Sequence, residues 1–506
     1  MASAAAMSNA PRRWDRAIPP VLRPAVRAYL LGYASAVGPR LLTLVLRHLA
    51  LARRSGRHTP KPPAGNDGKE AQTPSSFADD LRHVLGSALG WQRLPAFCGA
   101  LVGGATLLEI PLRSVLARHA HGLSELARTR LARWLASFLS GWFSLRCMLQ
   151  SKHTPSFTDV LPAASPDGKP VTVRYGGRTL DLTFLAVTAA VDTLLSTLWH
   201  RYRSSPSVRN RPPSSLLNRL DALAARLADP ALFALSSGLV MWAWFYHPAN
   251  LPRSYHRWIS SAAAVDGRLI TALQRCRDGS IVYGRDTGQA PLLQAMCDDY
   301  GWPREWGDPE KSVPFPCELV HMGVGPSCER HALSRFARSF RWAMATYLPI
   351  SLALGARRAR GPKILPAFRR ALLGAARSST FLASFIALFY YGVCLARTRI
   401  GPRLLGKDAA ARQRIDGGLC VATGCLLCGW SVAVETAARK KAIALFVAPR
   451  ALATLFPRRY DADKQWRETL AFAASVAVVV TAVRDPRGRP RVRGMVGSVV
   501  GSVFRE

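Results

Sequence analysis

Long apolar runs separated by short basic segments dominate the chain. Each run is rich in Ala, Leu, Val and Gly and lacks the strict alternation over about ten residues that a membrane β-barrel strand shows, so we predict α-helices. Several runs are shorter than the roughly 20 residues that a spanning helix prefers and therefore need protein neighbours. The runs lie near 27–50, 94–112, 134–149, 180–199, 231–247, 340–356, 379–396, 416–434, 442–456 and 470–483. This pattern predicts an all-α fold, a polytopic membrane helical bundle.

Composition supports a membrane protein over a soluble one. The chain has 506 residues, 49% of them hydrophobic, and a formal net charge of +38. A soluble domain of that charge would usually bind nucleic acid, but here Lys and Arg lie between the apolar runs, as in the loops of a polytopic membrane protein. We therefore expect membrane lipids as partners and no nucleic acid. The 10 Cys residues are too few and too scattered for the disulfide framework of a secreted protein.

The polar segments give the expected boundaries. Residues 1–19 form a basic flank of the first helix; their Arg and Ala content, with Asp15 as the single acid, also suits a mitochondrial transit peptide. Stretches rich in Pro, Ser and Gly without a helical period predict loops at 55–76, 150–178 and 203–216.

An internal repeat is the most informative feature of the sequence. The matches, in chain order, pair 26–40 with 340–357, 135–146 with 423–434, 189–202 with 448–459, and the run that ends at Pro248 with the run that ends at Pro486. Because all of them occur in the same order, we predict two homologous membrane halves, 20–262 and 335–506, joined by a connecting segment, 263–334. An odd number of spans in each half would make the repeats inverted, as in many transporters.

The connecting segment carries the one group of residues typical of metal chemistry. Its spacing is C-x3-H-x6-C-x2-H, formed by Cys317, His321, Cys328 and His331. Thiolate and imidazole in one short loop can close a tetrahedral zinc site, which makes Cys317, His321 and Cys328 the metal-ligand candidates. Two alternatives stay open, a Cys317–Cys328 disulfide in an oxidising compartment and buried thiols that act as small hydrophobic residues. The expected state has no cofactor, with zinc as the alternative.

Other polar and small residues in the apolar runs favour structural roles. Glu109 and Glu435 lie at helix ends close to basic residues, so we expect ion pairs in place of proton or substrate sites. The glycines within 99–104 and 424–429 predict close helix crossings. The sequence contains no Ser-His-Asp order, HExxH, Walker or dinucleotide motif, so no catalytic or cofactor-binding residue is expected.

The segment 316–358 resembles the transmembrane protein 135 family. That family opens one half with a Cys-rich element, then a helix with a Tyr-Leu step, here Tyr347-Leu348. The matching residues of the element are Cys317, Glu318, His321, Pro326, Ser327 and Cys328. A second match covers 434–456, so the resemblance extends over about 316–500. The first half lacks a Cys-rich element of its own, and His331 is not part of the family pattern.

The resemblance implies a multi-pass membrane protein of peroxisomes or mitochondria that is linked to lipid handling and organelle dynamics. It also implies distant kinship to the protein-translocase channels of the mitochondrial inner membrane and their peroxisomal relatives, and hence a channel- or transporter-like body. We expect a protein that is not an enzyme. The alternative is a membrane-embedded lipid-modifying or thiol- or zinc-dependent enzyme centred on Cys317, His321 and Cys328.

Overall fold

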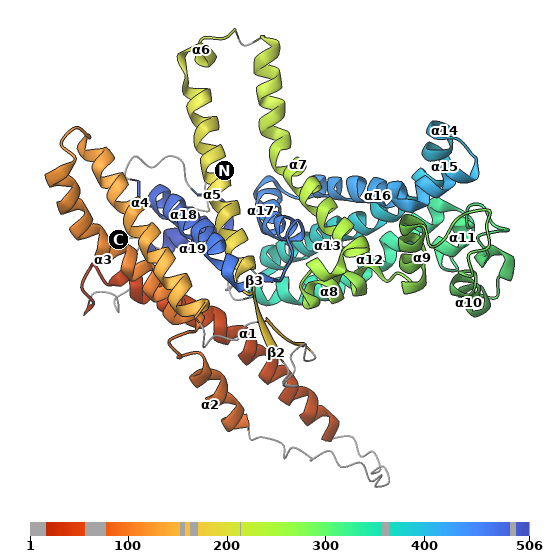
Figure 1. Ribbon diagram of the computed structural model, residues 1–506, viewed down its shortest axis with the longest axis horizontal. Coiled ribbons are helices and arrows are strands. Elements are labelled where there is room, and N and C mark those ends of the chain that lie inside the picture. The colour runs from red at the N-terminus through yellow and green to blue at the C-terminus, as the bar shows by residue number, and fades with distance from the viewer. Residues whose placement is uncertain are drawn as a thin grey trace. The chain divides into compact units, whose positions relative to one another are not determined.

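The computed structural model describes residues 17–55, 77–151, 157–161, 171–212, 214–356, 364–485 and 492–504, and almost all of them are helical (Figure 1). Every apolar run predicted from the sequence lies in a helix. The contacts group the chain into two compact units. Unit 1 comprises Met1–Ser205 with Arg459–Glu506, and unit 2 comprises Pro206–Arg458.

Unit 1 is a bundle of long helices in which α1 packs on α3, α3 on α4, α4 on α18 and α18 on α5. A π-helical turn, η2 (Leu145–Leu149), extends α4, and a 3-10 turn, η9 (Ala462–Lys464), precedes α18. The helices are α1 (Arg23–Ser55), α2 (Phe77–Ser87), α3 (Leu94–His119), α4 (Glu125–Ser144), α5 (Leu180–Ser204), α18 (Gln465–Val483) and α19 (Gly494–Phe504).

Unit 1 also holds a small antiparallel sheet of order β1-β2-β3. The strands are β1 (Phe157–Leu161), β2 (Val171–Gly176) and β3 (Tyr460–Asp461). Phe157 pairs with Tyr175, and Tyr175 also pairs with Asp461. The prediction of an unstructured loop at 150–178 is therefore wrong for β1 and β2. Strands this short are stabilised mainly by their partners, which local composition does not show.

Unit 2 is built around five helices, in which α12 packs on α13, α13 on α16, and both α16 and α17 on α7. These helices are α7 (Leu216–Tyr246), α12 (Cys328–Ala356), α13 (Ile364–Leu395), α16 (Cys420–Cys428) and α17 (Ala437–Thr454). The other helices are α6 (Pro206–Arg209), α8 (Arg253–Ala263), α9 (Gly267–Asp278), α10 (Pro291–Tyr300), α11 (Cys317–His321), α14 (Gly401–Leu404) and α15 (Ala409–Arg414). The 3-10 and π turns are η3 (Pro248–Asn250), η4 (Arg304–Gly307), η6 (Ala396–Ile400), η7 (Ile415–Leu419) and η8 (Gly429–Val434).

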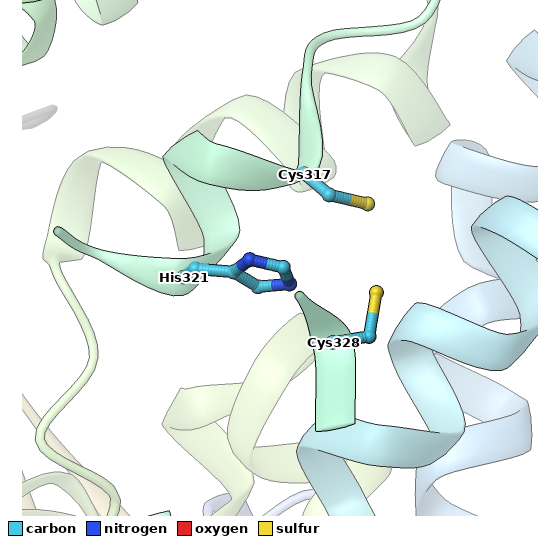
Figure 2. A group of neighbouring side chains, drawn as sticks. All are labelled: Cys317, His321 and Cys328. Carbon is cyan, nitrogen blue, oxygen red and sulfur yellow. The ribbon is translucent and has the colours of Figure 1, made fainter. Parts of the chain in front are cut away.

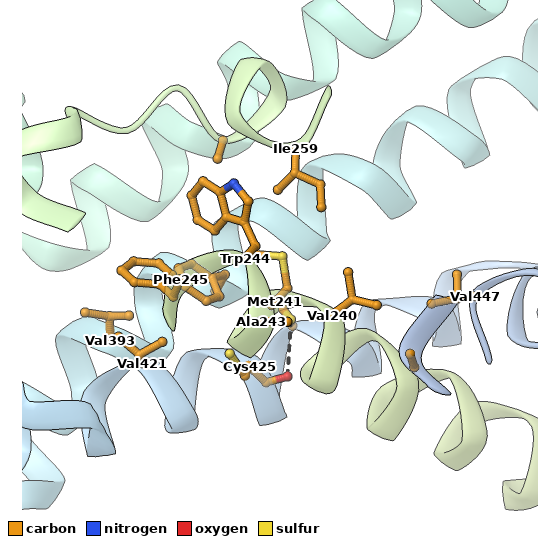
Figure 3. Close-up of a cluster of buried hydrophobic side chains, with 14 of the residues drawn as sticks. Val240, Met241, Ala243, Trp244, Phe245, Ile259, Val393, Val421, Cys425 and Val447 are labelled. Atoms are coloured by element: carbon orange, nitrogen blue, oxygen red, sulfur yellow. Dashed lines mark hydrogen bonds between the residues drawn. The ribbon is translucent and has the colours of Figure 1, made fainter. Parts of the chain in front are cut away.

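The core of unit 2 is apolar and aromatic (Figure 3). Trp244 and Phe245 of α7 lie at its centre, close to side chains from α8, α13 and α16. The indole N–H of Trp244 donates a hydrogen bond to Ser260 Oγ over 3.1 Å, so the ring is buried without leaving its polar atom unpaired. This core fixes α8, which follows α7 through η3, against the longer helices.

The two units repeat one order of helix contacts. The sequence α1-α3-α4-α18-α5 in unit 1 corresponds to α12-α13-α16-α7-α17 in unit 2, position by position. The internal repeat aligns four of these five pairs, all except α3 with α13. The last long helix of each predicted half, α7 or α18, belongs to the unit that contains the other half's first four helices. The two compact units thus differ from the two halves that the sequence predicts. That 20–262 and 335–506 arose by duplication stays a prediction.

Glycines lie at the helix crossings, as predicted for 99–104 and 424–429. A Cβ on Gly424 would lie 2.7 Å from the carbonyl oxygen of Phe389, and one on Gly392 would lie 2.8 Å from the Cα of Gly424. In unit 1, a Cβ on Gly104 would collide with Ser140. Only a residue without a side chain permits backbones to approach so closely, and such small-residue contacts are typical of helices that associate in a bilayer.

The protein is an integral membrane protein by the length and composition of its helices. Among the described residues, 7 helical segments are long and apolar enough to span a bilayer. They are Arg23–His48, Leu94–His119, Leu180–Ser204, Leu216–Tyr246, Ile364–Leu404, Ala409–Val434 and Ala462–Val483. The runs 134–149, 340–356 and 442–456 lie in helices that are not among these segments.

Alkaline carbonate extraction tests the membrane assignment. We expect the full-length protein to remain in the membrane pellet, because helices as apolar as these would expose their faces to water if released. Immunoblotting of pellet and supernatant, beside a known peripheral protein that is extracted, gives the readout. Recovery in the supernatant would mean that the apolar helices fold into a soluble core.

Candidate metal centre

The connecting segment folds around a core of its own. Buried side chains from α9, α10 and α11 form this core, and the whole of it lies in unit 2. Met296, Cys297 and Leu319 have no measurable exposure. A core of this size supplies little stability by itself, and small folded segments commonly depend on a metal or disulfide for the remainder.

Three predicted ligand residues converge at one end of this segment. Cys317 and His321 are the first and last residues of α11, and Cys328 is the first residue of α12. Since residues four apart share one helix face, Cys317 and His321 present their side chains together. The Sγ atoms and an imidazole nitrogen of the three residues lie within 4.8 Å of one another, and Figure 2 shows them directed into one space.

A tight turn brings Cys328 back beside α11. Met322 ends α11 in the left-handed region, with φ 51°, and Gly323 and Gly325 also have positive φ, 83° and 106°. The carbonyl oxygen of Gly325 accepts a hydrogen bond from His321 Nδ1–H over 2.6 Å. Ser327 Oγ then accepts the backbone N–H of Arg330 and caps the start of α12. Two family-motif residues are thereby explained, His321 and Ser327.

The remaining residues of the family motif, Glu318 and Pro326, are not among the potential metal ligands. Pro326 precedes the cap, and Glu318 lies in the first turn of α11, where its backbone carbonyl accepts the N–H of Met322. Neither belongs to the group of potential ligands that the described residues form. Their place is in the turn that positions Cys317 and Cys328.

A fourth donor comes from the long helix α13. Cys394 is buried, and its Sγ lies 3.5 Å from His321 Nε2. Because His321 Nδ1–H donates to Gly325, Nε2 carries the lone pair and faces the thiols. Cys394 also hydrogen-bonds with Cys317, which lowers the pKa of Cys317 to about 6; the charge of Arg397 lowers it as well, against burial. The cluster thus contains three thiols and one imidazole, of which Cys317, His321 and Cys328 offer ligand atoms within 4.8 Å of one another.

Sequence reasoning missed Cys394 because it lies far along the chain from the motif, inside the apolar run 379–396. The spacing in the sequence suggested His331 as the fourth metal ligand, but the structure gives that residue another role. His331 stacks on the imidazole of His321 with ring centroids 4.7 Å apart, outside the ligand group. Burial and the charge of Arg335 lower the pKa of His331 to about 3, so the ring is neutral.

The donor set fits zinc better than the two alternatives. Sulfur and nitrogen donors in one buried cluster suit zinc, and a ligating histidine usually donates its other N–H to a carbonyl or carboxylate, as His321 does. All 10 cysteines are free thiols, so Cys317 and Cys328 do not form a disulfide here.

A buried ion pair lies beside the cluster. Arg397 on η6 donates from Nε and Nη2 to the two carboxylate oxygens of Asp416 on η7, over 2.7 and 2.9 Å. Its Nη2 also donates to the carbonyl of Phe315 over 2.8 Å, and its Nη1 lies 3.8 Å from Cys317 Sγ. Tyr283 of the connecting segment donates its hydroxyl to Asp416. The pair therefore joins the helical bundle to the connecting segment.

The two carboxylates singled out in the sequence do lie in ion pairs. Glu109 in unit 1 accepts from Arg133 Nε over 2.8 Å and also pairs with Arg484. Glu435 in unit 2 pairs with Arg439 over 3.5 Å. The sequence did not indicate Arg397 and Asp416, although each is a charged residue at the edge of an apolar run, which is the available signal.

Comparisons with protein families, with curated proteins and with solved structures find no match. A role for the centre therefore rests on its geometry, and kinship with the transmembrane protein 135 family stays an expectation from the motif.

Metal analysis tests the four-ligand centre. We expect purified full-length protein to contain about one zinc per chain and Cys394→Ser to lose it as completely as Cys317→Ser, because a missing ligand opens the tetrahedron. Cys425→Ser, at a buried thiol elsewhere in unit 2, is the matched control and retains the metal. Zinc retained by Cys394→Ser would exclude that residue as a ligand, and a metal-free, well-folded wild type would exclude the site.

The ion pair yields a stability prediction. Asp416→Asn is expected to lower the free energy of unfolding by about 3–5 kcal/mol, because it leaves Arg397 buried without a counter-charge. Replacing both partners, Arg397→Met with Asp416→Leu, should recover much of that loss. Denaturant unfolding in detergent measures both, with Glu329→Gln at the exposed Glu329–Arg399 pair as a nearly silent control. Equal stability of Asp416→Asn and wild type would contradict the buried pair.

Proposed function

We propose that this protein is a non-enzymatic membrane protein of peroxisomes or mitochondria, linked to lipid handling or organelle dynamics, with a channel- or transporter-like body. The observation that carries the non-enzymatic part is the Cys3His cluster. If Cys317, His321, Cys328 and Cys394 together held a zinc ion, no position would remain for water or substrate, which a catalytic zinc keeps open. Such a centre would act on structure, by fastening the connecting segment to α13.

Membrane lipids are the partners that this composition suits best. The chain combines 7 candidate spans with a net charge of +38. Basic residues at the ends of spanning helices attract the anionic head groups of the membrane surface. The resemblance of 316–358 to the transmembrane protein 135 family supports the same conclusion and suggests the organelle.

A thiol-dependent enzyme is the second candidate, and one observation favours it. The lowered pKa of Cys317, about 6, would make this residue a thiolate at neutral pH and thus a nucleophile. The same lowering is what a zinc ligand requires, since metals bind the thiolate. The two roles differ in what happens to the protein when the thiol is removed.

Complementation distinguishes these roles. Cells that lack the protein would be complemented with wild type, Cys317→Ser, Cys394→Ser or Cys425→Ser, and each variant located against peroxisomal and mitochondrial markers. We expect wild type at one of these organelles, with the organelle's lipid composition restored. Both ligand variants should lose abundance and restoration in parallel, because the centre is structural, whereas Cys425→Ser behaves as wild type.

Two outcomes would contradict the proposal. If Cys317→Ser accumulates normally at the organelle but restores nothing, while Cys394→Ser restores, the thiol is catalytic. If removal of the protein leaves organelle lipids and morphology unchanged, the link to lipid handling fails.

A further inference from the structure

Unit 1 contains a cavity in which arginine side chains gather. Its volume is about 660 Å³, within the range of about 300–1,000 Å³ of small-ligand sites. The start of α1, the second half of α3 and the ends of α18 and α19 supply its walls. Four of the lining residues are arginines, namely Arg23, Arg27, Arg113 and Arg484. Guanidinium groups present several N–H donors in a fixed geometry that suits phosphate and carboxylate, so this lining is typical of a site for an anion.

The antiparallel packing of α1 on α3 brings this basic lining together. A Cβ on Gly103 of α3 would lie 3.1 Å from the Cβ of Ala25, near the start of α1. A Cβ on Gly32, two turns later in α1, would lie 3.0 Å from the Cα of Pro95, at the start of α3. The first turn of α1 therefore lies beside the later turns of α3, where the cavity is.

The only acidic residue in this lining, among those that the structure describes, already has cationic partners. Glu109 Oε1 accepts from Arg133 Nε over 2.8 Å, and Glu109 Oε2 accepts from Arg484 Nη1. The side chain of Glu109 is 7% exposed, so these two contacts satisfy a largely buried carboxylate. Its charge is therefore spent on Arg133 and Arg484 and does not balance Arg23 or Arg113.

Arg23 and Arg113 add positive charge that the lining does not neutralise. Arg23 Nε donates to the backbone carbonyl of Ile18 over 2.9 Å, which is a neutral acceptor. Arg113 is exposed, and within the described part of the chain its guanidinium has neither a carboxylate nor a carbonyl partner. Two guanidinium groups with N–H donors to spare, on one cavity, suit a ligand with several anionic oxygens.

The position of the cavity suggests where such a ligand comes from. The candidate span Arg23–His48 begins at the cavity, and the span Ala462–Val483 ends beside it. Val21 and Ile110, which also line it, have 40% and 56% of their side chains exposed. Helix ends lie near the head groups of a bilayer, and basic pockets between spanning helices at that depth bind anionic head groups.

We propose that this cavity binds the phosphate-bearing head group of an anionic phospholipid. Arg23 and Arg113 donate to the phosphate oxygens, and the acyl chains pass Val21 and Ile110 into the bilayer. Phosphatidic acid, whose head is a bare phosphate, presents the most anionic oxygens. Phosphatidylcholine is neutral overall, and its quaternary ammonium is repelled by the arginines. The inference rests on the proposed lipid function and adds the class of lipid and its site.

Native mass spectrometry of the full-length protein in detergent micelles tests the proposal. The ligands are dioctanoyl phosphatidic acid, dioctanoyl phosphatidylcholine and inorganic phosphate, titrated at one ionic strength. We expect the dissociation constant of phosphatidic acid to be at least about tenfold lower than that of phosphatidylcholine, because the two differ in head-group charge. It should also be lower than that of inorganic phosphate, which has no chains to bury.

Matched variants connect the binding to the cavity. Arg23→Gln and Arg113→Gln should each weaken binding of phosphatidic acid about fivefold, because each removes one cation near the phosphate. Arg118→Gln, exposed on the same helix α3 but outside the lining, is the control and should bind as wild type. Binding of phosphatidylcholine should stay the same in all three variants. Unchanged thermal unfolding without added lipid excludes misfolding as the cause.

The outcomes separate this inference from the function on which it rests. Equal binding of the two phospholipids, or equal effects of Arg113→Gln and Arg118→Gln, would overturn the site even if loss of the protein alters organelle lipids. Inorganic phosphate that binds as tightly as phosphatidic acid would overturn the assignment to a lipid. Selective binding that depends on Arg23 and Arg113 would uphold the site even if the organelle's lipids did not depend on the protein.

Discussion

The buried pair of Arg397 and Asp416 is the contact on which the arrangement of unit 2 depends. Two charges removed from water cost more than their mutual attraction returns unless every donor and acceptor is satisfied. Here the carboxylate accepts from Arg397 through two N–H groups and from the Tyr283 hydroxyl, and the guanidinium also reaches Phe315. Each of these partners comes from the connecting segment or from the ends of apolar helices. Moving Arg397 or Asp416 would leave a buried charge without its counter-charge, and moving Tyr283 or Phe315 would remove a hydrogen bond from the pair. The pair therefore favours one packing of the connecting segment on the helical bundle.

Two π-helical turns position this pair, because Arg397 lies on η6 and Asp416 on η7. A π turn holds one residue more than an α turn and so redirects the side chains around it, which is why such turns often occur at functional sites. Cys394 lies near the end of α13 and Arg397 in the η6 turn that follows it. Together they bring a thiol and a guanidinium to Cys317 of α11. The positive charge near Cys317 favours its thiolate, the form that binds a metal.

The sequence predicted most of the helices and three of the four residues that gather in the cluster, Cys317, His321 and Cys328, and the limits have physical causes. Apolar runs and the spacing from Cys317 to Cys328 are local features, readable within about a dozen residues. The place of Cys394 depends on how α13 packs against α11, which no local pattern encodes. The same holds for β1 and β2, whose pairing extends to β3 at the far end of the chain. The duplication of the two halves stays a prediction, and only contacts reveal that α7 and α18 pack with helices of the other predicted half.

Helix α13 contributes both to the candidate metal centre and to the wall of an apolar cavity in unit 2, at different places along its axis. Ser378 lies at the cavity and Cys394 at the cluster, so at 1.5 Å per residue they are about 24 Å apart along the axis. Coupling over that distance would need an element with two discrete arrangements, and the α-helical backbone of α13 is continuous between these residues. A metal held by Cys317, His321 and Cys328 would therefore act on the cavity only by holding α13 against α11 and α12. Loss of that contact would loosen one wall of the cavity as a whole and would leave the course of α13 itself unchanged.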